Sequence, residues 1–138
     1  LNHIVQHLLD EYGDHIHLLR DPTRGGVGTV LTEIARDTAL GIDIHQKDIP
    51  VDEQVYGACS LLGLDPLYVA NEGIFIAIVA AACAEMVLDQ LRGQSGSQNA
   101  SIIGEVVQDH AKQVVLPSGI GGKRVVNMLV GEQLPRIC

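Results

Sequence analysis

The last residue of the chain, Cys138, carries the side chain with the clearest capacity for chemistry. No residue follows it, and residues 131–135 form a Gly- and Pro-containing stretch that predicts an exposed tail rather than a helix or strand. A thiol with an ordinary pKa near ~8.5 is ionised enough at neutral pH to act as a nucleophile. Such a thiol can carry a bound group to chemistry elsewhere. The alternative is a cysteine placed here by chance or by an arbitrary boundary.

A second candidate site is the run Asp21-Pro22-Thr23-Arg24-Gly25-Gly26, which precedes a predicted helix. Amides at a helix N-terminus attract anions, and glycines let a phosphate approach the backbone closely. The guanidinium of Arg24 can add two parallel hydrogen bonds. The residues predicted to bind phosphate or substrate are Asp21, Thr23, Arg24, Gly25 and Gly26. An ordinary capped turn, in which Thr23 or Asp21 accepts from the first helical amides, fits the spacing equally well.

Glu72 is a candidate general base. It lies in the sequence Ala70-Asn71-Glu72-Gly73, between two segments that both read as apolar strands, over residues 67–69 and 74–80. Apolar surroundings raise the pKa of a carboxyl group and suit it to proton abstraction. The alternative is a solvated glutamate in a turn, which the pattern alone favours.

The other cysteines and the histidines point away from a metal site. Cys59 and Cys83 fall on the apolar stripes of predicted helices, so we expect both thiols to be buried and inert. The histidines form two closely spaced pairs, His3 with His7 and His15 with His17. No cysteine or carboxylate cluster joins either pair, and we predict no metal.

Alternating strand and helix patterns must position these residues. We predict helices over residues 2–11, 27–38, 50–62 and 81–91, and strands over 15–19, 42–44, 67–69, 74–80, 100–107 and 113–116. The clearest helix places Val27, Val30, Leu31, Ile34, Ala35 and Thr38 on one face. The predicted inward faces of the 50–62 and 81–91 helices consist of Val55, Cys59 and Leu62, and of Ala84, Val87, Leu88 and Leu91. No strand is predicted beyond residue 116, because Gly119, Gly121 and Gly122 loosen the chain. The pattern indicates one layered α/β or α+β domain.

Composition narrows the functions further. The formal net charge of −8 argues against nucleic acid as a partner. The longest apolar run, over residues 73–84, is too short to span a bilayer, so we expect no membrane association. Three cysteines without a C-x-x-C spacing suggest a reducing, cytoplasmic setting. Because the chain begins inside a predicted helix without Met, we expect a fragment whose N-terminal part is missing.

Taken together, these motifs resemble a known family. The 21–26 run before a helix, the Asn-Glu-Gly turn and the sequence Ile103-Gly104-Glu105-Val106 look like the C-terminal domain of the aminoimidazole ribonucleotide synthetase superfamily. The ending, Gly-Glu-Gln-Leu-Pro-Arg-Ile-Cys, is similar to that of one branch, the HypE family of carbamoyl dehydratases in nickel–iron hydrogenase maturation. The resemblance implies a three-layer α/β/α domain with a mixed sheet. It implies such a domain over residues 1–118 and a flexible tail over 119–138.

The resemblance also implies a mechanism. A carbamoyltransferase, HypF, places a carbamoyl group on Cys138, and ATP-dependent dehydration turns it into a thiocyanate that supplies cyanide to iron on a HypC–HypD scaffold. Glu72 would assist deprotonation of the amide, and the 21–26 residues would face the active cleft. ATP and Mg²⁺ would be bound mainly by an N-terminal domain, and the full-length protein would form a homodimer.

The same resemblance limits this chain. Without the nucleotide-binding domain, we expect the chain alone to bind no cofactor tightly and to be inactive; micromolar ATP affinity in calorimetry would contradict this. Two other interpretations stay open. One is a non-catalytic domain for dimerisation or partner docking, and the other is another ATP-dependent synthetase of the superfamily.

Overall fold

The computed structural model describes residues 1–117 and 122–128. Its α-helices are α1 (Asn2–Tyr12), α2 (Gly26–Thr38), α3 (Glu53–Leu62) and α4 (Ala84–Arg92). Its strands are β1 (Ile16–Arg20), β2 (Gly41–Ile44), β3 (Ile76–Val79), β4 (Gly104–Val107), β5 (Val114–Pro117) and β6 (Lys123–Val126). Short 3₁₀ turns include η2 (Gln46–Asp48), η3 (Pro66–Tyr68) and η4 (Ala81–Cys83).

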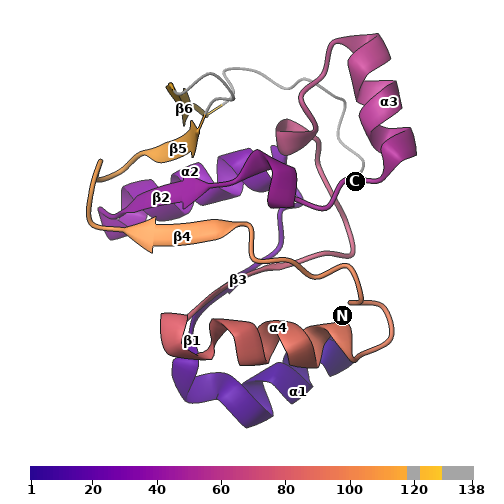
Figure 1. The fold of residues 1–138 in the computed structure, drawn as a ribbon, viewed down its shortest axis with the longest axis vertical. Coiled ribbons are helices and arrows are strands. Elements are labelled where there is room, and N and C mark those ends of the chain that lie inside the picture. The colour runs from indigo at the N-terminus through magenta and orange to yellow at the C-terminus, as the bar shows by residue number, and fades with distance from the viewer. Residues whose placement is uncertain (118–121, 129–138) are drawn as a thin grey trace.

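Strands β1 and β3 form a two-stranded antiparallel ribbon that crosses the middle of the molecule (Figure 1). The ribbon is apolar on both faces. Leu18 and Ile78 pack toward helix α2, whereas Leu19 and Val79 pack toward helices α1 and α4. Alternate side chains of a strand point to opposite faces, so one ribbon separates two hydrophobic clusters.

The other four strands form a mixed sheet in the order β4-β2-β5-β6. Strand β2 is antiparallel to β4 and parallel to β5, and β5 is antiparallel to β6. Strand β6 was not predicted, because the glycines before it masked a short strand. Val126 on β6 is only 3% exposed, so this strand contributes to the core and is not loose chain.

Helix α2 packs on one face of the mixed sheet, as its period predicts. Val30, Leu31, Ile34 and Ala35 are all buried on the predicted face. They meet sheet residues that are also buried, Ile42, Ile44, Val114, Leu116 and Val126. This cluster of β-branched and aliphatic side chains is the larger of the two cores.

Helices α1 and α4 form the second cluster beneath the ribbon. Leu8 on α1 is fully buried against Val87 and Leu91 of α4. The side chain of Gln90 donates to the Glu11 carboxylate at 2.6 Å and lies 3.2 Å from the ring nitrogen Nδ1 of His7, which ties the helices at their surface. The predicted inward face of α4 is thereby confirmed.

Three details of the sequence prediction were wrong. Residues 67–69 are not a strand: Pro66 starts the turn η3, whose first amide is capped by the side chain of Asp65. Helix α3 buries only Cys59, whereas Val55 and Leu62, predicted to face inward, are 44% and 71% exposed. Strands β3 and β4 begin later than predicted, because apolar residues alone do not define where pairing starts.

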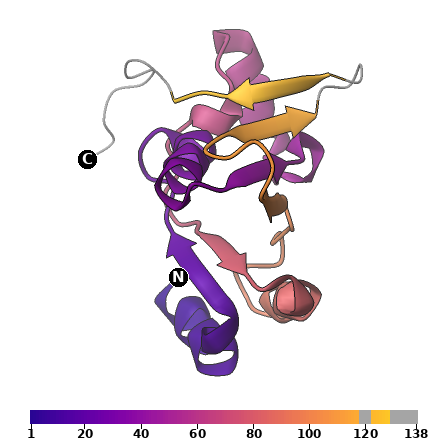
Figure 2. The same cartoon turned by 90° about the vertical axis from the view of Figure 1, so that its left-hand side faces the viewer.

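The predicted fold class, α+β with a mixed sheet, is confirmed. The strands, however, divide into two sheets, and the helices divide with them. Figure 2 shows α1 and α4 flanking the ribbon at one end, and α2 and the four-stranded sheet at the other. No described helix is long and apolar enough to cross a membrane.

Candidate functional site

The two turns singled out in the sequence emerge from the same end of the β1–β3 ribbon. Arg20, the last residue of β1, pairs with Ile76, the first residue of β3. The chain therefore runs out of β1 into the 21–26 turn beside the place where it enters β3 from the 71–73 bend. The ribbon thus brings together two motifs that are far apart in sequence.

A backbone hydrogen bond joins the turn and the bend directly. The amide of Asn71 donates to the carbonyl of Pro22 at 3.2 Å. Pro22 is among the most completely buried side chains of the chain, which fixes this part of the turn. Asp21 and Arg24 beside it are exposed, as are Asn71 and Glu72. Polar groups from both segments therefore reach solvent on either side of a rigid junction.

Gly26 permits the close approach of helix α2 to the segment before the bend. A Cβ atom at this position would lie 2.6 Å from the carbonyl oxygens of both Leu67 and Val69. Its φ of +65° also belongs to the left-handed region that favours glycine. Gly26 is therefore needed for packing and for backbone conformation at once.

The N-terminus of α2 has no side-chain cap. Gly25 is the N-cap, and neither Thr23 nor Asp21 accepts a hydrogen bond from the first amides of the helix. The capped-turn alternative is therefore wrong, and the positive end of the helix is uncompensated. Arg24 forms no ion pair with any residue in 1–117 or 122–128. An uncapped helix end beside an unpaired guanidinium fits an anionic ligand.

Glu72 differs from its prediction. The preceding segment is a 3₁₀ turn and the side chain is exposed, so the predicted apolar surroundings are absent. Gly73 after it has a φ of +80°, which turns the chain sharply toward β3. The bend holds Glu72 beside the 21–26 turn. Any role for its carboxylate depends on what covers this surface.

Cys59 and Cys83 are buried, as the sequence predicted. Cys59 is 5% exposed on α3, and Cys83 is 7% exposed in η4. Both thiols are free and buried. Cys138 lies outside the described residues, so its role stays a prediction. Within the described part of the chain, no group of three His, Cys, Asp or Glu side chains could hold a metal ion.

One polar pair escaped the sequence analysis. Nε2 of His110 lies 3.1 Å from Oδ1 of Asp43, and the two side chains are 16% and 23% exposed. The two atoms are close but do not meet the geometry of a hydrogen bond, and neither has another hydrogen-bonded partner. This contact pins the β4–β5 loop to strand β2. No short-range pattern could have revealed it, because the two residues meet only through sheet pairing.

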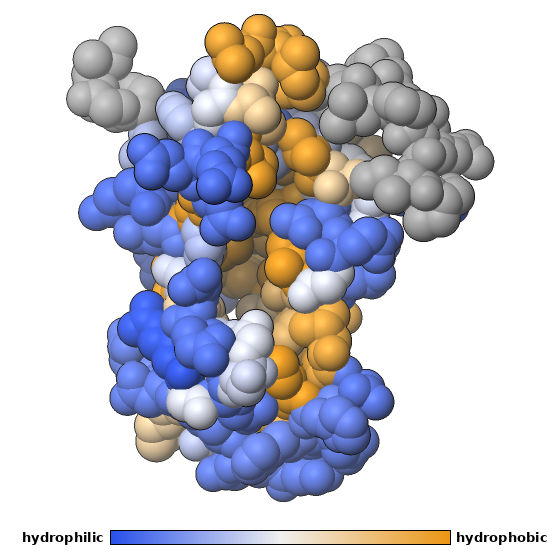
Figure 3. Space-filling view, turned by 90° about the vertical axis from the view of Figure 1, so that its right-hand side faces the viewer, coloured by the Kyte–Doolittle hydropathy of each residue, from blue (hydrophilic) through white to orange (hydrophobic). Residues whose placement is uncertain are grey.

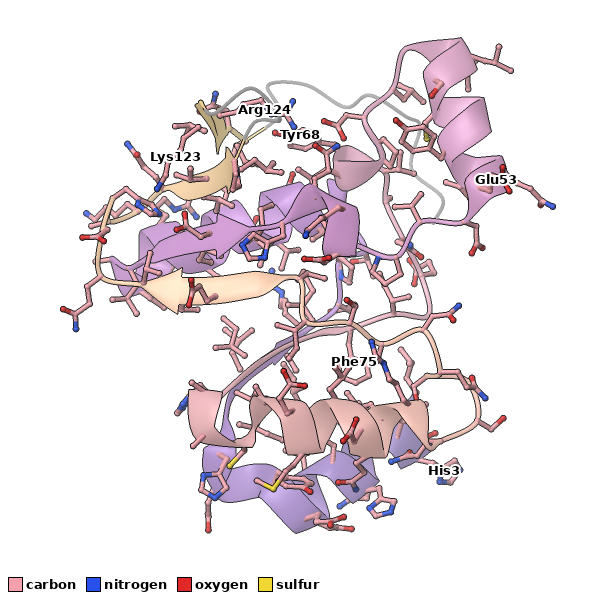
Figure 4. All side chains as sticks on the ribbon, viewed as in Figure 1. His3, Glu53, Tyr68, Phe75, Lys123 and Arg124 are labelled. Atoms are coloured by element: carbon pink, nitrogen blue, oxygen red, sulfur yellow. The ribbon has the colours of Figure 1, made fainter. Side chains whose placement is uncertain are left out.

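Strand β6 is attached to η3 by side chains visible in Figure 4. The hydroxyl of Tyr68 donates to the carbonyl of Asn127 at 2.9 Å, and Arg124 forms an ion pair with Asp65 at 3.3 Å. Partial burial raises the pKa of Tyr68 above its ordinary value of 10.0. Asn127, the first residue after β6, therefore lies beside η3.

We expect Tyr68→Phe to lower the free energy of unfolding by about 0.5–1.5 kcal/mol at neutral pH, since a hydrogen bond to Asn127 is lost. The raised pKa means that the folded state holds the phenol proton more tightly than the unfolded chain. Its contribution is therefore complete below about pH 10 and is lost as the pH rises further. Urea unfolding measures the free energy of unfolding of the unaltered protein and of Tyr68→Phe. The difference between these two values should be smaller above pH 10 than at pH 7. A difference that stays constant contradicts this assignment.

Comparison with known proteins identifies the family. The model of the AIR synthase related protein C-terminal domain matches residues 2–117. The chain belongs to this family of AIR synthase related C-terminal domains. The match spans both turns of the site and both sheets up to β5.

Particular members of this C-terminal domain family are similar to the chain. Carbamoyl dehydratase HypE of Azotobacter vinelandii is 51% identical over 123 residues, which are 89% of this chain and 36% of the relative. Carbamoyl dehydratase HypE of Bradyrhizobium diazoefficiens is 46% identical over all 138 residues, which are 40% of the relative. The chain thus spans about two fifths of the length of these relatives.

Solved structures of the same kind share the fold. The hydrogenase maturation protein HypE in complex with ATP superposes with a TM-score of 0.91 at 46% identity, over 100% of this chain and 42% of that one. HypE in a HypE–HypF complex superposes with a TM-score of 0.86 at 38% identity, over 94% of this chain and 41% of that one. The AIR synthase related domain described above therefore has the fold of the corresponding part of HypE.

Proposed function

We propose that this chain is the C-terminal domain of an ATP-dependent carbamoyl dehydratase that builds a cyano group on Cys138. The observation that carries the proposal is the similarity to carbamoyl dehydratase HypE over all 138 residues, which reaches the terminal cysteine. The uncapped helix end beside Arg24 supports it, because dehydration of an amide by ATP passes through anionic phosphoryl groups.

The proposed reaction has three steps. The Cys138 sulfur first takes a carbamoyl group and gives up its thiol proton. The carbamoyl oxygen then accepts the γ-phosphoryl group of ATP, which converts that oxygen into a leaving group and releases ADP. Loss of one nitrogen-bound proton gives an O-phosphorylated imidate, and loss of phosphate together with the second nitrogen-bound proton leaves a thiocyanate on the same sulfur. Water must be excluded meanwhile, or the activated group hydrolyses.

The residues of the site have distinct proposed roles. Glu72 takes the proton from nitrogen, and the rest of the full-length protein supplies the cover that its exposed position lacks here. Asp21, Thr23, Arg24, Gly25 and Gly26 face the same cleft. Of these, Arg24 and the amides after Gly25 have the charge to orient a phosphoryl group. Gly26 acts indirectly, by holding the turn against residues 67–69.

Several partners follow from the proposed reaction. HypE forms a complex with HypF in a solved structure, and we propose a HypF-type carbamoyltransferase as the donor to Cys138. HypE also binds ATP in a solved structure, and we propose ATP as the co-substrate. A HypC–HypD scaffold as cyanide acceptor, homodimerisation of the full-length protein and a cytoplasmic location complete the proposal. We propose that Mg²⁺ accompanies the ATP and is bound mainly outside this chain, since the described residues hold no group of three His, Cys, Asp or Glu side chains.

The proposed domain boundary takes the new strand into account. Strand β6 pairs with β5 along its whole length and buries Val126. We therefore propose that the domain includes β6 and that the carrier tail begins after Met128.

A chimera tests the function. The corresponding C-terminal part of Bradyrhizobium diazoefficiens HypE, which aligns with all 138 residues, is replaced by this chain and expressed in a strain that lacks its own HypE. We expect hydrogenase activity to return. A soluble, folded chimera that restores none contradicts the proposal and favours a docking domain or a synthetase making a different product.

Glu72→Gln in this chimera is expected to slow dehydration by about 10²–10⁴-fold, the usual contribution of a general base. Carbamoylation of Cys138 should continue, because that step does not need the base. The accumulated carbamoyl form is measured by mass spectrometry of the intact protein. Glu85→Gln, which makes the same change of charge in the exposed first turn of α4, serves as the control. Equal rates in the two variants would remove Glu72 from the mechanism.

A further inference from the structure

An apolar groove lies between helix α3 and the turn η3, and nothing in the described chain fills it. Its volume is about 180 Å³, and its walls include Ile49, Val51, Tyr56, Pro66 and Leu67. Val51 is 38% exposed and Tyr56 is 59% exposed, so the groove is rimmed by apolar surface that water contacts. Figure 3 shows apolar residues gathered over α3 and in a band below it on this face. Exposed apolar side chains gathered around a hollow are typical of a docking surface.

Strand β6 and Asn127 after it are held beside this groove. Asn127 is held by the Tyr68 hydroxyl, and Tyr68 follows directly after the wall residues Pro66 and Leu67. Asp65, which also lines the groove, is paired with Arg124 of β6. Both attachments fix the point where the last ten residues begin. Those residues can reach at most about 35 Å when extended. The wall residues Pro66 and Leu67 directly precede Tyr68, which holds Asn127, so the groove lies within this reach.

The sequence of the last ten residues suits an apolar groove. It contains Leu129, Val130, Leu134 and Ile137. Pro135 restricts both itself and Leu134 to extended backbone, which lowers the entropy lost on binding. Arg136 can meet the acidic residues Asp52 and Glu53, which follow Val51 at the start of α3.

We propose that the groove between α3 and η3 is a resting site for the chain's own C-terminal segment, residues 129–138. The purpose of such a site rests on the proposed function: a docked tail keeps Cys138 in one place between its visits to the carbamoyl donor and to the dehydration site. The docking itself needs no carbamoyl group, ATP or partner. It can therefore be tested apart from the chemistry.

The test attaches a nitroxide spin label to Cys138 of the 138-residue chain and records amide resonances by NMR. Cys59 and Cys83 are buried and should not react. We expect paramagnetic loss of intensity at residues 46–56, in addition to the residues near Asn127 that the tail must pass. The loss should not change on dilution. Broadening that weakens on dilution would show docking on a second copy and would overturn the proposal.

Three variants make the result specific. Tyr56→Asp in the groove and Leu134→Asp in the tail should both restore intensity at residues 46–56, and the tail variant leaves every residue of the described core unaltered. Leu61→Asp is the matched control: Leu61 is 90% exposed, about 200° around the helix from the buried Cys59, and the broadening should persist. Broadening that is absent from the unaltered protein, or unchanged by Leu134→Asp, contradicts the proposal. Either outcome leaves the chimera experiment unaffected.

Discussion

Replacement of Cys138 by alanine in the chimera is expected to reduce hydrogenase maturation by on the order of 10³-fold or more, to background. The reason is that every proposed step takes place on this sulfur. Removal of a group that bears a covalent intermediate eliminates the pathway rather than slowing one step. Hydrogenase activity in cells measures the effect. Protein level and melting temperature should be unchanged, since the proposed role of Cys138 is chemical and not structural.

Two control variants show whether the loss of hydrogenase maturation is due to the missing sulfur of Cys138. Cys138→Ser keeps the size and polarity of the side chain but not the nucleophilic sulfur, and it should be equally inactive. Cys59→Ala removes a buried thiol from α3, so it should cost stability while leaving maturation in place. Activity retained by Cys138→Ala would leave the terminal cysteine without a role and would favour the docking-domain alternative.

Gly26→Ala is expected to lower the free energy of unfolding by about 2–5 kcal/mol. A non-glycine residue at positive φ costs about 1–2 kcal/mol, and overpacking adds about 1–3 kcal/mol. The added methyl group would meet the carbonyl oxygens of Leu67 and Val69, which are backbone atoms and cannot rotate away. Because a domain of this size is stable by only about 5–15 kcal/mol, much of that margin is lost. Denaturant unfolding measured by circular dichroism gives the value.

Gly63→Ala is the matched control for this substitution. Its φ of +68° is nearly that of Gly26, but a Cβ atom there has no neighbour within 4 Å. It should therefore cost only the conformational part, about 1–2 kcal/mol. The difference between the two variants isolates the contact between α2 and residues 67–69. Equal losses would show that this contact is not tight.

Parts of this fold that depend on local pattern could be predicted from the sequence. The period of α2 predicted six residues on one face: Val30, Leu31, Ile34 and Ala35 are buried, whereas Val27 is half-buried and Thr38, at the end of the helix, is exposed. The alternation before Asp21 predicted β1. In contrast, β6 is four residues long and follows three glycines, so its pairing with β5 has no local signal. Likewise, Leu62 is exposed because α3 has little to pack against, which periodicity cannot reveal.

The candidate site was predicted in its parts but not in its assembly. The sequence indicated both the 21–26 turn and Glu72, with no reason to place them together. The register Arg20 to Ile76 and the hydrogen bond from Asn71 to Pro22 do so. The sequence also left capping and anion binding equally favoured; α2 has no side-chain cap, which excludes the first, and anion binding is our proposal. Whether Glu72 becomes buried depends on surfaces beyond this chain.

The most direct test of the central claim is the mass of Cys138 during turnover. The chimera is incubated with a HypF-type carbamoyltransferase, carbamoyl phosphate and ATP, and the C-terminal peptide is analysed by mass spectrometry. The account predicts a carbamoyl adduct on Cys138 that, in the presence of ATP, loses one water to become a thiocyanate. An unmodified Cys138, or a carbamoyl adduct that ATP never dehydrates although the chimera is folded, would contradict it.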